Sequence, residues 1–180
     1  MGLKGEGICD DRIWIAKAHH PLYLPKVLEF TSHKVLMCVR HPLDVLPSYA
    51  SLCNTLNHSA KPDWEWEEFC PEWWDGFVRQ QTVTMKRYFD LLLRHCTKEG
   101  KNPIYICRYE DLVTQKKEEL MGIFSFLLDV ETLEGTNAER RIDQVIEMGA
   151  AASQTYKLKA STGKFNTHWK RYTPEQIAFI

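Results

Sequence analysis

The stretch KVLMCVRHPLDVLPSYASLC, residues 34–53, decides which fold we expect. Its first part, Lys34 to Val39, is a short apolar run typical of a strand that is buried on both faces. The run stops at Arg40-His41-Pro42, and from Leu43 onward apolar residues recur at helical spacing. Pro47 is tolerable in such a helix only near its start. The stretch therefore predicts a buried strand that leads directly into a helix.

The same alternation extends along the rest of the chain. Helices connect parallel strands, because parallel neighbours need a crossover. We therefore expect an α/β fold, with a parallel sheet flanked by helices in a single domain over residues 1–180. Ligands of such sheets sit at the carboxyl ends of the strands. The further expected strands are Arg12–Lys17 and Ile104–Cys107, and the further expected helices are Pro25–Thr31, Trp74–Leu93, Thr114–Leu128, Asn137–Met148 and Pro174–Ile180.

Composition argues against several classes of partner. The net charge is -1, from 23 basic and 24 acidic residues spread along the chain, so we expect neither a nucleic acid nor an anionic membrane as partner. No apolar run approaches the roughly 20 residues that span a bilayer. Met1 to Asp10 lacks the pattern of a signal peptide. A soluble, cytoplasmic protein is the simplest expectation.

The cysteines indicate neither a disulfide framework nor a metal site. The chain has 6 cysteines, without a C-x-x-C pair or a Cys/His cluster at zinc spacing. Cys38 and Cys107 fall inside the expected strands, where a cysteine usually serves as a small buried hydrophobe. We assign no chemistry to any cysteine.

Arg40 and Ser48 form the strongest local motif, at the junction of a strand and a helix. Arginine offers a planar fork of donors that matches phosphate, the serine hydroxyl adds another donor, and a helix start contributes free backbone N–H groups. These groups together suit a phosphomonoester. The alternative is that Arg40 forms an ion pair with Asp44 at the helix start while Ser48 faces solvent.

A second motif, Lys17-Ala-His19-His20-Pro21, follows the first expected strand. A histidine in this position can hold a pKa near neutrality and take a proton from a hydroxyl. Adjacent histidines also allow a metal site, but no carboxylate or cysteine stands at ligand spacing. Ordinary structural histidines are the other alternative.

Two further segments are weaker. Tyr109 follows a buried strand and can stack on a base, while Glu110 or Asp111 can cap the next helix. The stretch from Ser161 to Tyr172 is basic and contains a glycine, so it is able to wrap a phosphate from outside the sheet. Its alternative is a solvated basic tail.

The order and spacing of these motifs resemble the PAPS-dependent sulfotransferases. K-A-H-H-P is similar to their K-T-H-x-P motif, and Arg40 with Ser48 is similar to their 3'-phosphate signature R-x7-S. R-Y-E-D-L is similar to their Y-E-D segment, and G-K-F-N-T-H-W-K-R-Y-T-P-E-Q resembles their closing R-K-G-x-x-G-D-W-K region. The resemblance runs from about Arg12 to Gln176.

The resemblance implies a fold like that of P-loop NTPases and a role for each matching residue. His19 is then the general base, and Lys17 supports the reaction centre. Arg40 and Ser48 bind the 3'-phosphate, and Tyr109 contacts adenine. In the closing region Gly163 is the best match and Lys164 is a candidate phosphate ligand, and both are assigned to cofactor binding. Trp73 and Trp74 are placed near the acceptor pocket, with an ordinary helix-face core as the alternative.

The expected reaction is transfer of a sulfuryl group from PAPS to a hydroxyl or amine of a small-molecule acceptor, with PAP as product and no metal. A P-loop kinase is a rival, against which the missing Walker lysine counts. A degenerate domain that binds PAP or a partner protein without catalysis is the other rival.

The chain departs from the family pattern in two places. No segment before Arg12 resembles the family's phosphosulfate loop, and Ser161 and Thr162 stand where an Arg-Lys pair precedes glycine in the family. The absent loop leads us to expect a domain that is incomplete at the N-terminus and a chain that is inactive by itself. The C-terminus is expected to be incomplete as well, because the chain ends within the expected helix Pro174–Ile180.

Overall fold

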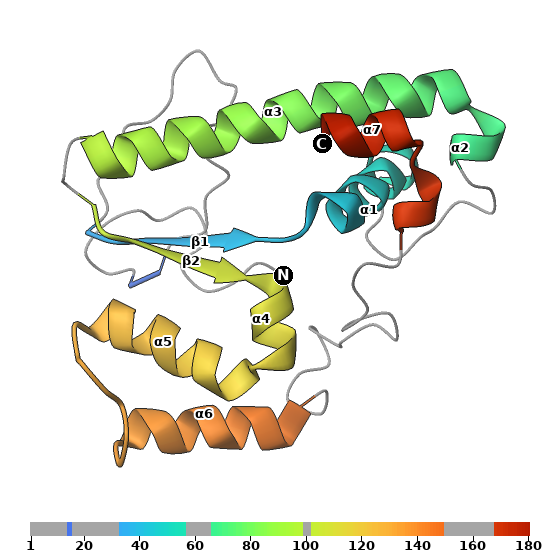
Figure 1. Ribbon diagram of the computed structural model, residues 1–180. Helices are drawn as coiled ribbons and strands as arrows, with labels where there is room; N and C mark the ends of the chain where they lie inside the picture. The colour runs from blue at the N-terminus through green and yellow to red at the C-terminus, as the bar shows by residue number, and fades with distance from the viewer. Residues whose placement is uncertain (1–13, 16–32, 57–65, 99–101, 150–167) are drawn as a thin grey trace.

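The computed structural model describes residues 14–15, 33–56, 66–98, 102–149 and 168–180, and Figure 1 shows their arrangement. Strands and helices alternate along the chain. The elements are β1 (Val35–Val39), α1 (Pro42–Thr55), α2 (Trp66–Phe69), α3 (Pro71–Lys98), β2 (Ile104–Arg108), α4 (Tyr109–Thr114), α5 (Lys116–Leu128), α6 (Asn137–Met148), a 3-10 turn (Trp169–Arg171) and α7 (Pro174–Phe179).

β1 and β2 form a parallel pair, in agreement with the predicted sheet. The register sets Val35 beside Ile104 and Val39 beside Arg108. α1, α2 and α3 lie between the two strands in the sequence and supply the crossover that parallel strands need. Both strands therefore end at the same edge of the sheet.

The strand predicted over Arg12–Lys17 is described only at Trp14 and Ile15. These residues carry no strand assignment and are 65% and 57% exposed, so the prediction of a buried strand is wrong there. Trp14 instead lies beside α5, with its ring centroid 6.4 Å from that of Phe124. The helix predicted over Pro25–Thr31 lies outside the described residues.

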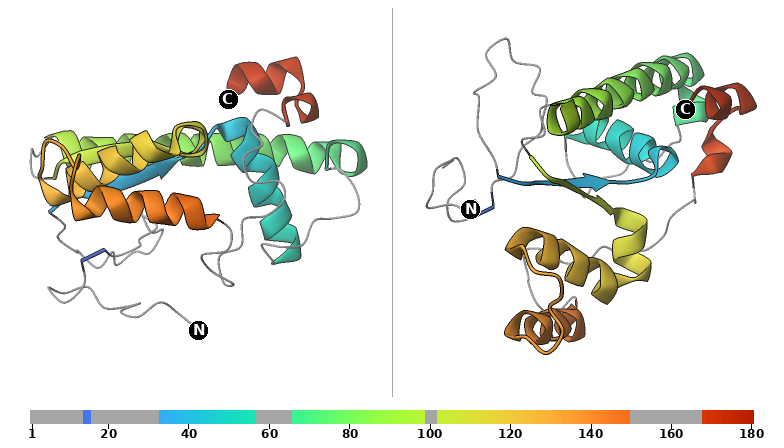
Figure 2. Two further views of the ribbon diagram at one scale, coloured as in Figure 1. Left: turned by 90° about the horizontal axis from the view of Figure 1, so that it is seen from below. Right: turned by 60° about the vertical axis from the view of Figure 1, so that its left-hand side comes forward.

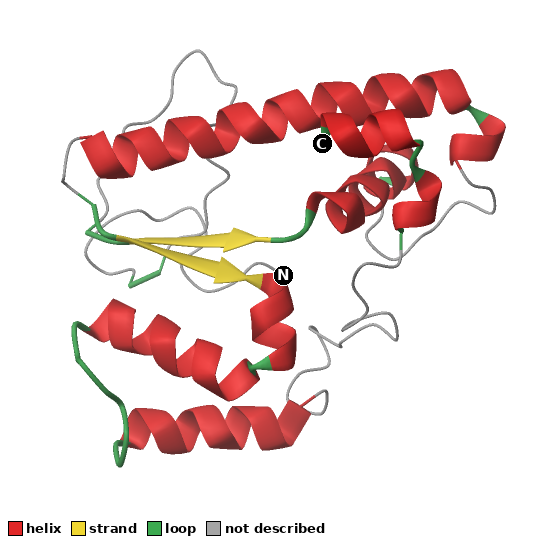
Figure 3. Cartoon of the chain, viewed as in Figure 1, coloured by secondary structure: helices red, strands yellow, loops and turns green. Residues whose placement is uncertain are grey.

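A helix lies on each face of the strand pair. α3 runs along one face, α5 lies on the other, and α6 forms an outer layer against α5 (Figures 1, 2 and 3). Met37 of β1 is buried against Tyr88 and Phe89 of α3. On the opposite face, Tyr105 of β2 packs against Phe126 of α5, with ring centroids 5.6 Å apart.

The two strand cysteines differ in burial, although they are neighbours in the register. Cys107 is buried, as predicted, whereas Cys38 is exposed, so the prediction is wrong for Cys38. The reason is that α5 packs on β2. Burial raises the pKa of the Cys107 thiol to about 12, which leaves this thiol protonated and inert at neutral pH.

The helix predicted over Thr114–Leu128 is α5, which begins two residues later at Lys116, whereas α4 was not predicted. β2 passes directly into α4, and Gln115 then breaks the helix with φ -128° and ψ 51° before α5 begins. The Thr114 hydroxyl donates to the Glu110 carbonyl at 2.9 Å in the last turn of α4. α6 has the predicted bounds, and α3 and α7 differ from prediction only at their ends.

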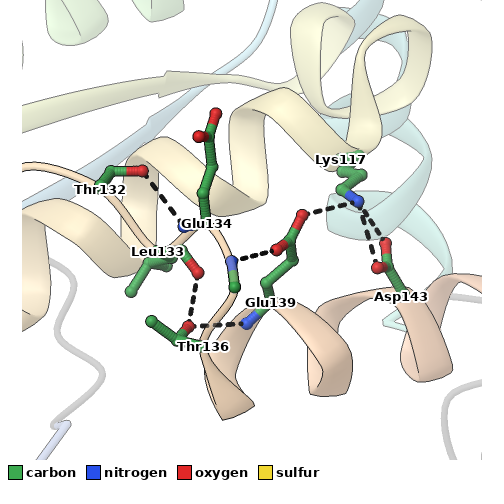
Figure 4. Close-up of polar contacts among 8 residues, drawn as sticks. Lys117, Thr132, Leu133, Glu134, Thr136, Glu139 and Asp143 are labelled. Carbon is green, nitrogen blue, oxygen red and sulfur yellow. Dashed lines mark hydrogen bonds and ion pairs between the residues drawn. The ribbon is translucent and has the colours of Figure 1, made fainter.

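A polar network attaches α6 to α5 (Figure 4). Thr136 caps α6 by accepting from the Glu139 N–H at 3.3 Å, while Glu139 accepts from the Gly135 N–H at 2.8 Å. Lys117 of α5 reaches both Glu139, at 3.1 Å, and Asp143, at 2.9 Å. The Glu139 carboxylate thus takes part in the cap of α6 and also forms an ion pair with Lys117 of α5.

The C-terminal segment completes the main hydrophobic core. Tyr172 is buried there with residues of α1 and α3, including Leu46, Trp74 and Val78. The Tyr172 hydroxyl donates to the Leu43 carbonyl at 3.0 Å. Among the described residues, no helix has the length and apolar character that crossing a membrane requires.

Candidate functional site

The site is centred on the edge of the sheet where β1 and β2 end. Because Val39 and Arg108 are in register, the residues that follow them, Arg40 and Tyr109, leave the sheet side by side. The Arg40 guanidinium carbon lies 4.6 Å from the centroid of the Tyr109 ring, a cation–π contact. The structure thus brings together the residue predicted to bind phosphate and the residue predicted to contact adenine.

Arg40 has a donor that the fold does not satisfy. Its Nε atom is buried and has no hydrogen-bond partner, and no ion pair joins Arg40 to a carboxylate among the described residues. The alternative in which Arg40 pairs with Asp44 at the helix start is therefore not what the structure shows. A buried guanidinium N–H without an acceptor is costly, and such groups concentrate where a ligand completes the site.

Nearby carboxylates are engaged elsewhere. Glu110 Oε1 accepts from the His41 backbone N–H at 2.9 Å. Asp111 lies 3.5 Å from Arg108. Neither carboxylate neutralises Arg40, so the guanidinium keeps its positive charge for an incoming anion.

The start of α1 does not offer the free backbone N–H groups that we expected. The His41 N–H is taken by Glu110, and Pro42 has no N–H. The next N–H groups all turn back to His41: Leu43 donates to its Nδ1 at 3.3 Å, and Asp44 and Val45 donate to its carbonyl at 3.0 and 3.1 Å. An anion at the start of α1 therefore cannot rely on these N–H groups.

Ser48 lies on α1 and is exposed. Within the described part of the chain, no hydrogen bond connects its hydroxyl to Arg40 or Tyr109. Lys17, His19, Gly163 and Lys164 lie outside the described residues, and their predicted roles stay predictions.

The two tryptophans predicted near the acceptor pocket have different environments. Trp74 is 2% exposed and its indole Nε1 donates to the Arg171 carbonyl at 3.0 Å, which supports the alternative of a helix-face core. Trp73 is 41% exposed and stacks on Phe77, with ring centroids 5.0 Å apart.

Sequence reasoning missed the role of Glu110. We expected Glu110 or Asp111 to cap the following helix, but the N-cap of α4 is Arg108 and has no side-chain cap. Glu110 instead accepts a hydrogen bond from His41 at the start of α1. The helices α1, α2 and α3 and the strand β2 lie between these two residues in the sequence. Only the register of β1 and β2 could have indicated this contact.

Two hollows on the described surface lie apart from Arg40 and Tyr109. A hollow of about 450 Å³ is lined by α6 residues, and another of about 490 Å³ lies where α2 and α3 meet the segment around α7. Neither is lined by Arg40 or Tyr109. Within the described ranges, no group of three or more His, Cys, Asp or Glu side chains could hold a metal ion.

The sulfotransferase domain family model matches residues 11–176. The chain belongs to the sulfotransferase family. Comparisons with curated proteins and with solved structures found no match. The matched range of this sulfotransferase includes Arg40 and Tyr109 as well as the histidine motif and the basic stretch before Tyr172.

The described part of this sulfotransferase domain is mostly helical, with a small parallel sheet of two strands. That architecture is consistent with the predicted α/β class. At the carboxyl edge of this sheet, the Arg40–Tyr109 pair presents a cation and an aromatic ring side by side.

Proposed function

We propose that this sulfotransferase transfers the sulfuryl group of PAPS to a hydroxyl or amine of a small-molecule acceptor. One observation carries the proposal: the Arg40 guanidinium is stacked on Tyr109, with a buried Nε that lacks an acceptor. The 3'-phosphate of the nucleotide supplies the missing acceptor, because arginine binds phosphate oxygens through charged, directional hydrogen bonds. The adenine ring is a natural partner for Tyr109.

In this proposal the nucleotide is held mainly by side chains. Arg40 and Ser48 bind the 3'-phosphate, Tyr109 contacts adenine, and Gly163 and Lys164 contribute to phosphate binding. The occupied N–H groups at the start of α1 make Arg40 the main donor among the described residues. The arrangement of a P-loop-like fold around the nucleotide belongs to the same proposal.

When bound, PAPS supplies the sulfuryl group, which the acceptor receives as PAP departs. His19 takes the proton from the attacking hydroxyl or amine as the new bond forms. Lys17 stabilises the negative charge at the reaction centre. Arg40 holds the nucleotide so that the donor and the acceptor meet in line.

The same observation supports a second candidate, a domain that binds PAP without catalysis. The contact between Arg40 and Tyr109 bears on nucleotide binding and carries no information on proton transfer, so it fits either candidate. Binding and turnover must therefore be tested separately.

Binding is tested with Arg40→Ala. We expect this change to raise the Kd for PAP by roughly 10- to 100-fold, since a hydrogen bond to a charged group contributes about 1.5 to 3 kcal/mol. It should affect adenosine 5'-phosphate, which lacks the 3'-phosphate, much less. Calorimetry measures both affinities, together with those for PAPS and for ATP with magnesium.

Arg108→Ala is the matched control for Arg40→Ala. It removes the same charge from the neighbouring strand end, where Arg108 is exposed and is paired with Asp111. We expect it to leave PAP affinity nearly unchanged. Equal losses for PAP and adenosine 5'-phosphate in Arg40→Ala would contradict the phosphate assignment, and tight magnesium-dependent ATP binding would favour a kinase.

Catalysis is tested with His19→Ala and His20→Ala. We expect His19→Ala to abolish transfer from radiolabelled PAPS to a panel of alcohols and amines while PAP affinity stays the same. His20→Ala should have a mild effect, because only one of two adjacent side chains can readily face the acceptor. PAP binding without transfer by the unaltered protein would favour the non-catalytic candidate, and a larger effect of His20→Ala would show that the motif is out of register.

A further inference from the structure

Two contacts link the same two turns at the edge of the sheet. Arg40 packs over Tyr109, and the next residue of each turn forms the second link, in which Glu110 Oε1 accepts from the His41 N–H at 2.9 Å. The regular pairing of β1 and β2 ends at Val39 and Arg108. Beyond these last paired residues, the Glu110–His41 hydrogen bond therefore holds the two turns together.

We propose that Glu110 is a positioning residue that fixes Arg40 over Tyr109 and so orients the guanidinium toward the nucleotide 3'-phosphate. This inference rests on the proposed function. Glu110 acts through the backbone of the β1–α1 turn and does not itself touch the ligand.

A long arginine side chain needs such a constraint. A cation–π contact tolerates many guanidinium orientations, so the direction of the Arg40 donors depends on where the backbone starts the side chain. A hydrogen bond to an ionised carboxylate is roughly twice as strong as one between neutral groups. Glu110 supplies that bond at His41, directly after Arg40.

The same contact also keeps Glu110 from competing with the ligand. A carboxylate at this edge is the natural ion-pair partner of a guanidinium, yet Glu110 binds a backbone N–H and no ion pair joins it to Arg40 among the described residues. Arg40 is left with a buried Nε that has no acceptor. The Glu110 carboxylate thus bonds to the backbone of the turn, and the Arg40 guanidinium stays available for the phosphate of the ligand.

Asp111 provides a matched control. It stands beside Glu110 in the first turn of α4, so removing either charge has a similar effect on the helix dipole. Asp111 pairs with Arg108 and not with the β1–α1 turn. A role that depends only on charge or on α4 stability should appear in both variants.

The first experiment measures positioning without ligand. In the full chain, we expect Glu110→Ala to raise the hydrogen-exchange rate of the His41 amide by about tenfold or more, as a lost hydrogen bond does. The NMR signal of the Arg40 Nε–H should move toward that of an unstructured arginine. Glu110→Gln, which keeps a carbonyl acceptor, and Asp111→Ala should leave both signals close to those of the unaltered protein.

The second experiment measures binding. Glu110→Ala should raise the Kd for PAP by about tenfold, with a much smaller change for adenosine 5'-phosphate, and Glu110→Gln should restore most of the affinity. If Glu110→Ala does not fold, as a melting curve would reveal, Glu110→Met preserves side-chain length without an acceptor and takes its place.

The outcomes separate the two proposals. An unchanged Arg40 Nε–H signal in Glu110→Ala, or equal effects of Glu110→Ala and Asp111→Ala, would overturn the positioning role. Unchanged PAP affinity in a protein that does bind PAP would overturn it as well. If the unaltered chain binds no PAP while the Arg40 signal still moves in Glu110→Ala, the proposed function fails and Glu110 positions Arg40 for some other purpose.

Discussion

At the scale of single residues, Pro47 and Tyr172 form a pair that spans the chain. Pro47 lies inside α1 and has no N–H to donate to the Leu43 carbonyl, four residues earlier. The Tyr172 hydroxyl donates to that carbonyl at 3.0 Å. The carbonyl that lacks its helical donor because of Pro47 is therefore hydrogen-bonded by a tyrosine far away in the sequence. This contact, in addition to the position near the helix start, explains why α1 tolerates Pro47.

Tyr172→Phe should reduce the free energy of unfolding by about 0.5 to 1.5 kcal/mol, because the part-buried Leu43 carbonyl loses its donor. In a Pro47→Ala background the same change should cost less, since the amide restored at position 47 can bond to Leu43. Denaturant unfolding of the double-mutant cycle measures the difference. Equal costs in the two backgrounds would show that the hydroxyl and the proline are not coupled.

The dependence of stability on alkaline pH tests the burial of Tyr172. Burial raises the pKa of Tyr172 above its usual value, so folding favours the neutral phenol. The corresponding stability is present below about pH 10, the ordinary tyrosine value, and is lost as the pH rises toward the folded value. Unfolding free energies measured from pH 8 to 11 should fall less steeply in Tyr172→Phe.

At the scale of elements, Gly122 determines how closely α5 approaches β2. A Cβ atom at this position would lie 2.5 Å from Tyr105 Oη and 3.3 Å from its Cζ. Glycine usually weakens a helix interior by about 0.5 to 1 kcal/mol, and here it allows a strand side chain to lie against the helix backbone. Close packing of α5 on the sheet thus depends on the missing side chain.

Gly122→Ala should destabilise the protein by about 1 to 3 kcal/mol through overpacking, despite the better helix propensity of alanine. In a Tyr105→Phe background the loss should be smaller, because the nearest atom is gone. Gly76→Ala in α3 is the control: a Cβ added there would meet nothing within 4 Å, so the change should stabilise the protein. Thermal unfolding compares the variants, and stabilisation by Gly122→Ala alone would refute the close approach.

At the scale of the whole molecule, three half-buried carboxylates share one response to acid. Hydrogen bonds from Arg79 and Lys86 lower the pKa of Asp75 and of Asp90, respectively. The Gly135 N–H, followed by Lys117, lowers the pKa of Glu139. Because these pKa values are lower in the folded state, the stability they confer is present above the unfolded values and is lost as the pH falls through the folded ones.

We therefore expect unfolding free energy to decline as the pH falls below about 5, near the upper end of carboxylate titration. Glu139→Gln should make this decline less steep, and about 0.5 M salt should weaken the ion-pair part of the effect. Denaturant titrations from pH 3 to 7 measure the slope. An unchanged slope in Glu139→Gln would exclude Glu139 from the acid response.

Much of the architecture could be predicted from local pattern. Apolar runs at Lys34–Val39 and Ile104–Cys107 indicated β1 and β2, and helical periodicity indicated α1 and the bounds of α6. Such patterns work because burial selects side chains at the period of the element itself. The short helix α4 escaped prediction, since its 6 residues are too few to show a helical period.

The sequence by itself determined that strands alternate with helices, that β1 and β2 are parallel, and that the motifs are those of a sulfotransferase. Only the tertiary structure decided that Arg40 lies on Tyr109, that Glu110 bonds to the start of α1 instead of capping α4, and that Tyr172 donates to the carbonyl that Pro47 leaves without its helical donor. The physical reason is distance along the chain. Propensity and periodicity act between residues a few positions apart, whereas these contacts join segments that meet only after the sheet register and the helix packing are set.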